Sequence, residues 1–129
     1  MKDNIIKKLS YEFAIKIVTL YKLISKDKNE YILSKQILRS GTSVGALVRE
    51  AEQAESKADF IHKLSIALKE ANETSYWLEL LKDTEFISEK IFLEYKKDLD
   101  TLLKLLVSII KTSKKNNLLV INNPLSIIN

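Results

Sequence analysis

The chain has 129 residues, of which 46% are hydrophobic and 29% are charged, and its formal net charge is +4. This composition is typical of a single globular domain and excludes an intrinsically disordered chain. Because there is no cysteine, disulfides, thiolate metal sites and cysteine nucleophiles are excluded as well. Two glycines and one proline leave little material for tight turns, which favours long helices over strands.

The first helix and the link after it can be placed from hydrophobic spacing. Apolar residues recur at steps of three and four, which predicts an amphipathic helix that carries Ile6, Leu9, Phe13, Ile17, Leu20 and Ile24. A polar break follows over residues 26–29, and Asn29 is placed to cap a second helix. That helix is expected to end near Ala54 or Glu55 and to carry Tyr31, Ile37, Leu38, Gly41, Val44, Val48 and Ala51.

Serine caps mark the third and fourth helices. Ser56 with Asp59 resembles a capping box and predicts the start of the third helix. The apolar seam of this helix, with Trp77 and Leu81 beside it, consists of Ile61, Leu64, Leu68, Ala71, Ser75 and Leu78. Ser88 predicts the fourth start, flanked by a hydrophobic staple, and the same spacing continues through Tyr95, Leu99, Leu102, Leu106 and Ile109. The staple consists of Ile87 and Phe92. Four amphipathic helices with short links predict an all-α fold, an antiparallel up-down-up-down four-helix bundle.

The end of the sequence differs in kind from the bundle domain predicted over residues 1–115. Residues 116–129, NNLLVINNPLSIIN, carry no charged side chain and include the only proline, Pro124. Two interpretations are open. The tail is either a frayed terminus, or an apolar segment that docks on its own bundle or on a neighbouring subunit, because residues 118–121 are large and aliphatic.

The stretch RSGTSVGALVRE, residues 39–50, holds both glycines inside a predicted helix. Each glycine there costs about 1 kcal/mol relative to alanine, so the pair needs a structural reason. The GxxxG spacing fits neither a P-loop nor a dinucleotide-binding loop, and charged residues flank it too closely for a membrane-helix motif. We predict a close helix contact, inside the bundle or between subunits, at Gly41, Ser43, Gly45 and Leu47.

Catalytic and metal-binding chemistry has little support, and we predict no catalytic residue, metal site or cofactor. His62 is the only histidine, and on one helix Asp59, His62 and Ser65 cannot gain an oxyanion hole. A di-iron bundle needs two Glu-x-x-His pairs, which one histidine cannot supply. We therefore expect Glu52, Glu55, Asp59 and His62 to form a polar stripe on a protein that is not an enzyme.

Charge patterning leaves the choice of partner open. Five basic residues on the second and third helices are candidate phosphate contacts: Arg39, Arg49, Lys57, Lys63 and Lys69. Alternatively, they pair on solvated faces with the nearby acidic residues Glu50, Glu52, Glu55 and Glu70. No apolar run approaches the roughly 20 residues that span a bilayer, and the N-terminus lacks the apolar core of a secretory signal. We expect a soluble cytoplasmic protein without a membrane partner.

The stretch from Gln36 to Leu81 resembles the four-helix-bundle proteins encoded in the intervening sequences of bacterial 23S rRNA genes. The matching features are the LRSGTSVGA block, the acidic stretch after it, the S-K-x-x-F-I start of the third helix and the LSIALKEANET run. The resemblance covers roughly residues 5–115. This family usually has Asn after the Gly-Ala pair, whereas this chain has Leu47, which implies apolar packing in place of a polar contact.

The resemblance implies a subunit that assembles into a ring of five and has no known enzymatic activity. Members are similar to the accessory protein of diversity-generating retroelements, a basic pentameric barrel that binds nucleic acid and a reverse transcriptase. By this analogy we expect a homopentamer whose partner is RNA or a nucleic-acid-bound protein. The alternative is a protein–protein interaction scaffold without nucleic-acid binding.

Overall fold

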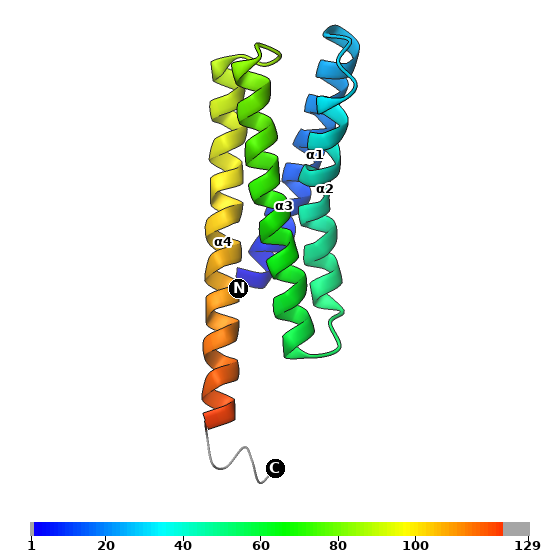
Figure 1. The fold of residues 1–129 in the computed structure, drawn as a ribbon. Coiled ribbons are helices and arrows are strands. Elements are labelled where there is room, and N and C mark those ends of the chain that lie inside the picture. The colour runs from blue at the N-terminus through cyan, green and yellow to red at the C-terminus, as the bar shows by residue number, and fades with distance from the viewer. Residues whose placement is uncertain (1, 123–129) are drawn as a thin grey trace.

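The computed structural model describes residues 2–122, and over that range it consists of four α-helices and no strand. They are α1 (Lys2–Asp27), α2 (Leu33–Glu52), α3 (Lys57–Asp83) and α4 (Glu89–Asn122). The α1–α2 and α3–α4 links lie at one end of the molecule and the α2–α3 link lies at the other (Figure 1). Both α1 and α3 pack against α2 and α4. The predicted all-α class is confirmed.

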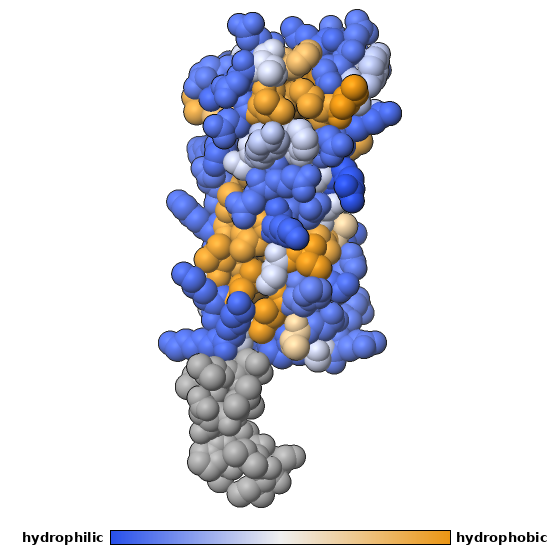
Figure 2. Space-filling view, in the orientation of Figure 1, coloured by the Kyte–Doolittle hydropathy of each residue, from blue (hydrophilic) through white to orange (hydrophobic). Residues whose placement is uncertain are grey.

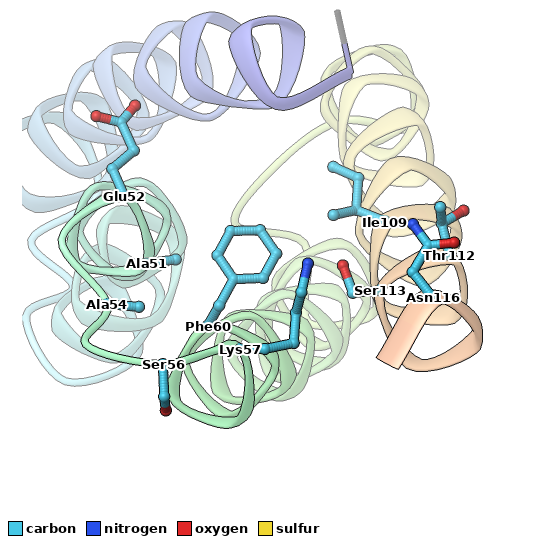
Figure 3. Close-up of a pocket in the computed structure, with 10 residues that line it drawn as sticks. All are labelled: Ala51, Glu52, Ala54, Ser56, Lys57, Phe60, Ile109, Thr112, Ser113 and Asn116. Atoms are coloured by element: carbon cyan, nitrogen blue, oxygen red, sulfur yellow. The ribbon is translucent and has the colours of Figure 1, made fainter. Parts of the chain in front are cut away.

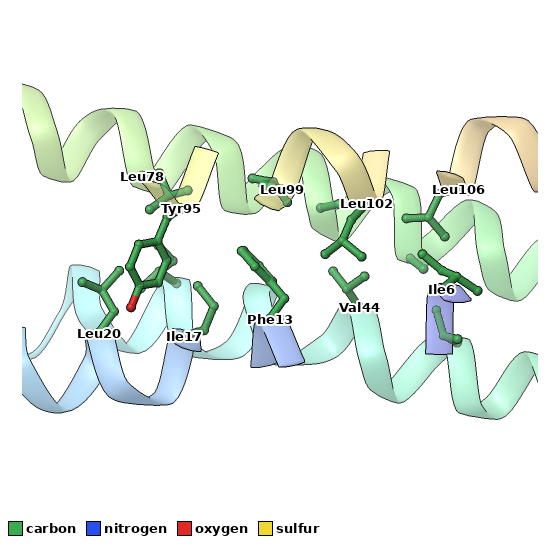
Figure 4. Packing of buried hydrophobic residues seen from close by; sticks show 14 of the residues in the cluster. Ile6, Phe13, Ile17, Leu20, Val44, Leu78, Tyr95, Leu99, Leu102 and Leu106 are labelled. Atoms are coloured by element: carbon green, nitrogen blue, oxygen red, sulfur yellow. The ribbon is translucent and has the colours of Figure 1, made fainter. Parts of the chain in front are cut away.

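Buried side chains from all four helices meet along the centre of the molecule. Figure 4 shows Phe13 and Ile17 of α1 facing Leu99 of α4 across this core, and all three side chains are almost completely buried. The core face of α3 differs from the predicted seam, because its buried residues are Leu64, Ala67, Ala71, Thr74, Leu78 and Leu81. Ile61, Leu68 and Ser75 are only partly buried. These three recur every seven residues and lie on one flank of the helix, beside its buried face.

The predicted serine caps are confirmed. Ser56 Oγ accepts the Asp59 backbone N–H at 3.0 Å, and Ser88 Oγ accepts the Ile91 N–H at 3.1 Å. The two staple residues around Ser88 are buried. Local sequence therefore determines where α3 and α4 begin, since a serine oxygen satisfies a backbone donor that the helix itself leaves unpaired.

The cap of α2 is not Asn29, and that prediction was wrong. Asn29 adopts a left-handed conformation with φ 53°, which asparagine tolerates better than most residues. The chain turns there, and the Glu30 carboxylate accepts the backbone N–H groups of Ile32, Leu33 and Ser34 at 3.1, 2.9 and 2.8 Å. Burial opposes ionisation of Glu30, but these three donors outweigh it and hold its pKa below its usual range.

The bounds of α2 also differ from the prediction. The helix begins at Leu33, so Tyr31 lies outside it and is 51% exposed. It ends at Glu52, two or three residues earlier than expected, because the N–H groups of Gln53 and Ala54 bond three residues back, to the carbonyls of Glu50 and Ala51. These tighter bonds close the last turn of the helix.

Helices α1 and α4 meet along a partly polar seam. The Tyr95 hydroxyl donates to the Lys16 carbonyl oxygen at 2.8 Å, and the Lys16 ammonium pairs with Asp98 and, at 3.3 Å, with Glu94. Burial opposes the charge on Lys16, but the two carboxylates outweigh it and raise the pKa of Lys16. Burial also raises the pKa of Tyr95. The seam therefore joins the first and last helices by directional contacts as well as by core packing.

Helix α4 continues to Asn122, past the predicted domain boundary at residue 115, and projects beyond the α2–α3 link (Figure 1). Residues 123–129 and the side chains of residues 117–122 lie outside what the structure describes, and so does the choice between a frayed and a docked tail. Within the described range, no helix is long and apolar enough to cross a membrane.

Candidate nucleic-acid interface

The two glycines of α2 face α1 of the same chain. A Cβ atom added at Gly41 would lie 2.7 Å from Cγ1 of Ile17, and one added at Gly45 would lie 3.2 Å from the carbonyl oxygen of Ser10. Real Cβ atoms are essentially never found as close as the first distance. The absence of side chains at these positions therefore lets α2 approach α1 closely.

Ser43 and Leu47 lie on the side of α2 that faces α3. Both line a shallow hollow between α2 and α3, together with Arg39 of α2 and Ile66 of α3. Leu47, at the position where the resemblance implies apolar packing, is partly buried and packs against the core. The four residues predicted to share one helix contact are thus divided between the α1 side and the α3 side of α2.

Three of the five candidate phosphate contacts lie close to carboxylates. Lys63 Nζ is 3.2 Å from Glu50 Oε1, which joins α3 to α2. Burial raises the pKa of Glu70, and the nearby positive charges of Arg39 and Lys69 act against that shift. This part of the α2–α3 surface is consequently of mixed charge, which lowers its attraction for phosphates.

The other two candidates lie over aromatic rings. The Arg49 guanidinium is 5.0 Å from the ring centroid of Tyr11 on α1, and Lys57 Nζ is 5.8 Å from that of Phe60. Both distances are within the range of a cation–π contact. The five residues are thus dispersed among local partners and do not make one continuous basic patch.

A different set of basic residues is aligned along α4. The α4 lysine row consists of Lys90, Lys97, Lys104 and Lys111, all of them exposed. A step of seven residues rises about 10.5 Å and turns only about 20° away from a full repeat, so all four side chains lie on one face of the helix. The ion pairs within the described range involve other lysines and none of these four.

Around the second half of the row, the surroundings are basic and apolar. Residues 101–116 include Lys114 and Lys115 besides two members of the row, and they contain no aspartate or glutamate. Beside the row, Leu68 of α3 and Leu103 and Val107 of α4 line a groove of about 590 Å³. Figure 2 shows apolar surface where α3 and α4 run side by side, flanked by hydrophilic side chains. This surface could hold a polyanion by charge and a second apolar surface by burial.

Two of the three residues considered for catalysis form hydrogen bonds with nearby backbone groups. Asp59 Oδ2 accepts the Glu55 N–H at 3.3 Å, and Ser65 Oγ donates to the Ile61 carbonyl at 2.8 Å. His62 is exposed. Among the residues that the structure describes, no group of three or more His, Cys, Asp or Glu side chains is placed to hold a metal ion.

Comparison with known proteins assigns the chain to a family. The family described as 23S rRNA-intervening sequence protein matches residues 2–108. The chain belongs to this family. A crystal structure of a protein with unknown function from the S23 ribosomal protein family of Bacteroides thetaiotaomicron VPI-5482 is 59% identical, with a TM-score of 0.85. The similarity covers 86% of this chain and 99% of that one. No curated protein matches the sequence.

The lysine row extends past the residues that match the 23S rRNA-intervening sequence protein family. Lys90, Lys97 and Lys104 lie within the family match, whereas Lys111 and the lysines after it follow its end at residue 108. The candidate phosphate contacts chosen from the sequence all lie on the second and third helices, and they do not include the row. The seven-residue lysine spacing along the fourth helix was the signal that could have revealed it.

Proposed function

We propose that this 23S rRNA-intervening sequence protein is a non-enzymatic, homo-oligomeric cytoplasmic protein that binds RNA or a ribonucleoprotein through the α4 lysine row. The observation that carries the proposal is the alignment of four exposed lysines over about 32 Å of one helix face without carboxylate partners. Lysines that contact phosphates release the counterions condensed on a nucleic acid, and this release drives binding.

The oligomer that we propose is a ring of five subunits, each an antiparallel up-down-up-down bundle. Its support is the family resemblance together with apolar surface that one subunit leaves uncovered. The α3–α4 groove is one such surface, and exposed aliphatic side chains on α1 are another, among them Ile15, which is 52% exposed. Contact with a second copy would remove such surface from water, and each Å² of apolar surface buried would stabilise the oligomer by about 25 cal/mol.

Binding of the purified protein to a labelled structured RNA across a salt series tests the RNA proposal. Lys97→Ala, Lys104→Ala and Lys111→Ala are combined in one variant of the row. Each lysine that contacts a phosphate contributes about 1 to the slope of log K against log salt, so the triple variant should lose about 3 from that slope. The matched control combines three exposed lysines elsewhere, Lys22, Lys26 and Lys28, each replaced by alanine, and it should keep the slope.

Three outcomes would contradict the proposal in different ways. Absence of binding at low salt would remove the RNA function and favour the scaffold, for which the apolar groove is the supporting observation. Binding that is insensitive to salt would exclude phosphate contacts as its source. A slope unchanged in the row variant but reduced by Arg39→Ala, Arg49→Ala and Lys63→Ala would place the interface on α2 and α3.

A further inference from the structure

Three carboxylates of α4 are neutralised by lysines outside the α4 lysine row. Glu94 and Asp98 pair with Lys16 of α1, and Asp100 pairs with Lys96 one turn earlier on the same helix. These acidic side chains therefore do not cancel the charge of the row. A polyanion that approaches the outer face of α4 meets four ammonium groups in line.

The side chains between the lysines of the row do not read bases. Residues three or four positions from a lysine lie on its face of the helix. Besides two of the paired carboxylates, the residues at such positions between the lysines are Leu93, Thr101, Val107 and Ser108. None of these is an arginine, asparagine or glutamine, the side chains that form bidentate hydrogen bonds with purine bases. The face therefore offers charge for phosphates and no device that selects a sequence.

The described part of α4 presents no aromatic ring beside the row on which an unpaired base would stack. Phe92 and Tyr95, the aromatic residues of this helix, are buried in the core. Figure 3 shows the Phe60 ring of α3 pointing into a hollow of about 770 Å³ between α2, α3 and α4. The exposed tyrosines belong to α1, to the α1–α2 link and to α3. Proteins that bind single strands gain about 1–3 kcal/mol from each stacked base, a contribution that the row lacks.

Electrostatic attraction alone then decides which form of nucleic acid the row prefers. The row holds its charges over about 32 Å of one straight helix face. A duplex presents two strands of phosphates along this length, whereas a single strand presents one. Each phosphate contact contributes about 0.9 to the salt slope on a DNA duplex and about 0.7 on a single strand, so four contacts predict slopes of about −3.6 and −2.8. The row should therefore favour the duplex.

We infer that the RNA held by the α4 lysine row is double-stranded and that the row contacts its phosphates irrespective of sequence. This inference rests on the proposed RNA function and specifies its substrate class, a paired stem rather than a loop or an unpaired strand. Double-stranded RNA is recognised mostly by its shape and backbone, because side chains cannot read its deep, narrow major groove. Lysine fits this task, since its flexible stem carries a compact charge that needs no fixed geometry.

Competition between paired and unpaired RNA tests the inference. The full chain is titrated with a labelled RNA duplex of about 20 base pairs, longer than the roughly 16 that a compact duplex-binding domain spans, and with each of its separated strands. We expect the duplex to bind about tenfold more tightly than either strand at the same salt, with the steeper salt slope. A duplex of the same length and unrelated sequence should bind within about twofold of the first.

Two variants show whether the row produces this preference. The combination of Lys97→Ala, Lys104→Ala and Lys111→Ala should lose most of the preference for the duplex, because it removes three of the four charges. The control that replaces Lys22, Lys26 and Lys28 should keep the preference. Circular dichroism verifies that both variants are helical.

The possible contrary results separate this inference from the proposed function. A single strand that binds as tightly as the duplex would overturn the inference and leave RNA binding in place. Loss of that binding in Tyr76→Ala would then identify the exposed ring on α3 as a stacking platform. A tenfold difference between the two duplexes would overturn it as well, since bases would then be read. Absence of binding to every RNA at low salt would remove the proposed function, and this inference with it.

Discussion

Replacing Gly41 by alanine is expected to destabilise the protein, although alanine is the better helix former. The replacement gains about 1 kcal/mol of helix propensity at an interior position. Against this gain, the new Cβ would lie 2.7, 2.9 and 3.0 Å from Cγ1, Cγ2 and Cδ1 of Ile17, a side chain with no exposed surface. A β-branched side chain in a helix has one strongly preferred rotamer, so Ile17 cannot turn away without strain.

The magnitude follows from these opposing effects. Overpacking of a core costs about 1–3 kcal/mol, so the net loss for Gly41→Ala should be about 1 kcal/mol. Gly45→Ala is the matched control, because its Cβ would meet a single backbone oxygen at 3.2 Å, which a shift of a few tenths of an ångström relieves. There the propensity gain and the packing cost should nearly cancel, and the stability should change by less than about 0.5 kcal/mol.

Urea unfolding at one fixed protein concentration measures these differences, since assembly would otherwise change the apparent stability. Ile17→Ala removes the three atoms that collide with the new Cβ, so it should cost less in the Gly41→Ala protein than in the parent. The coupling in this double-mutant cycle should be about 1–2 kcal/mol. Additive effects, or a Gly41→Ala protein that is more stable than the parent by its full propensity gain, would show that the two helices do not touch at this glycine.

Three further predictions concern hydrogen bonds. Glu30→Gln should cost about 1 kcal/mol at pH 7, because it weakens the cap of α2. The pKa of Glu30 in the folded protein lies below its ordinary value of 4.5, so its contribution to stability is present above that pH and is lost as the pH falls through the folded pKa. The urea midpoints of the two proteins should therefore converge in acid, and a constant difference would exclude the carboxylate. Tyr95→Phe should cost about 1 kcal/mol in thermal unfolding, and an unchanged midpoint would mean that the bond to the backbone of Lys16 adds nothing. The Thr74 hydroxyl donates to the Ser40 hydroxyl oxygen at 2.9 Å in the core. Thr74→Val and Ser40→Ala should therefore each lower the free energy of urea unfolding by about 1–2 kcal/mol, and the double variant should lose less than the sum of the two. Strict additivity would refute a shared hydrogen bond.

The helices could be predicted because their signals are local. Ser56 and Ser88 cap the helices that follow them through bonds to residues three positions away, which the sequence displays directly. The cap that Glu30 forms could not be predicted from the sequence in the same way. It depends on the left-handed backbone of Asn29, which sets where α2 begins and which no residue pattern specified.

The orientation of α3 and the candidate interface needed tertiary information. The apolar residues of α3 form a stripe wide enough for two alternative seams, and contact with both α2 and α4 decides that Thr74 is buried and Leu68 is not. The pairing of Lys63 with Glu50 likewise joins two helices and determines which charges are compensated. The lysine row, in contrast, lies on a single helix, and its seven-residue spacing could have been predicted from the sequence.

The seam between α1 and α4 has a consequence for the order in which the protein folds. The contacts of α2 and α3 and those of each with its adjacent helix join neighbours in the chain, so they form after the closure of short loops. The contacts of Tyr95 and Asp98 with Lys16 connect positions about 80 residues apart and bear the largest closure entropy. We therefore expect this seam to close last and to open first, so that substitutions there accelerate unfolding and leave the folding rate almost unchanged.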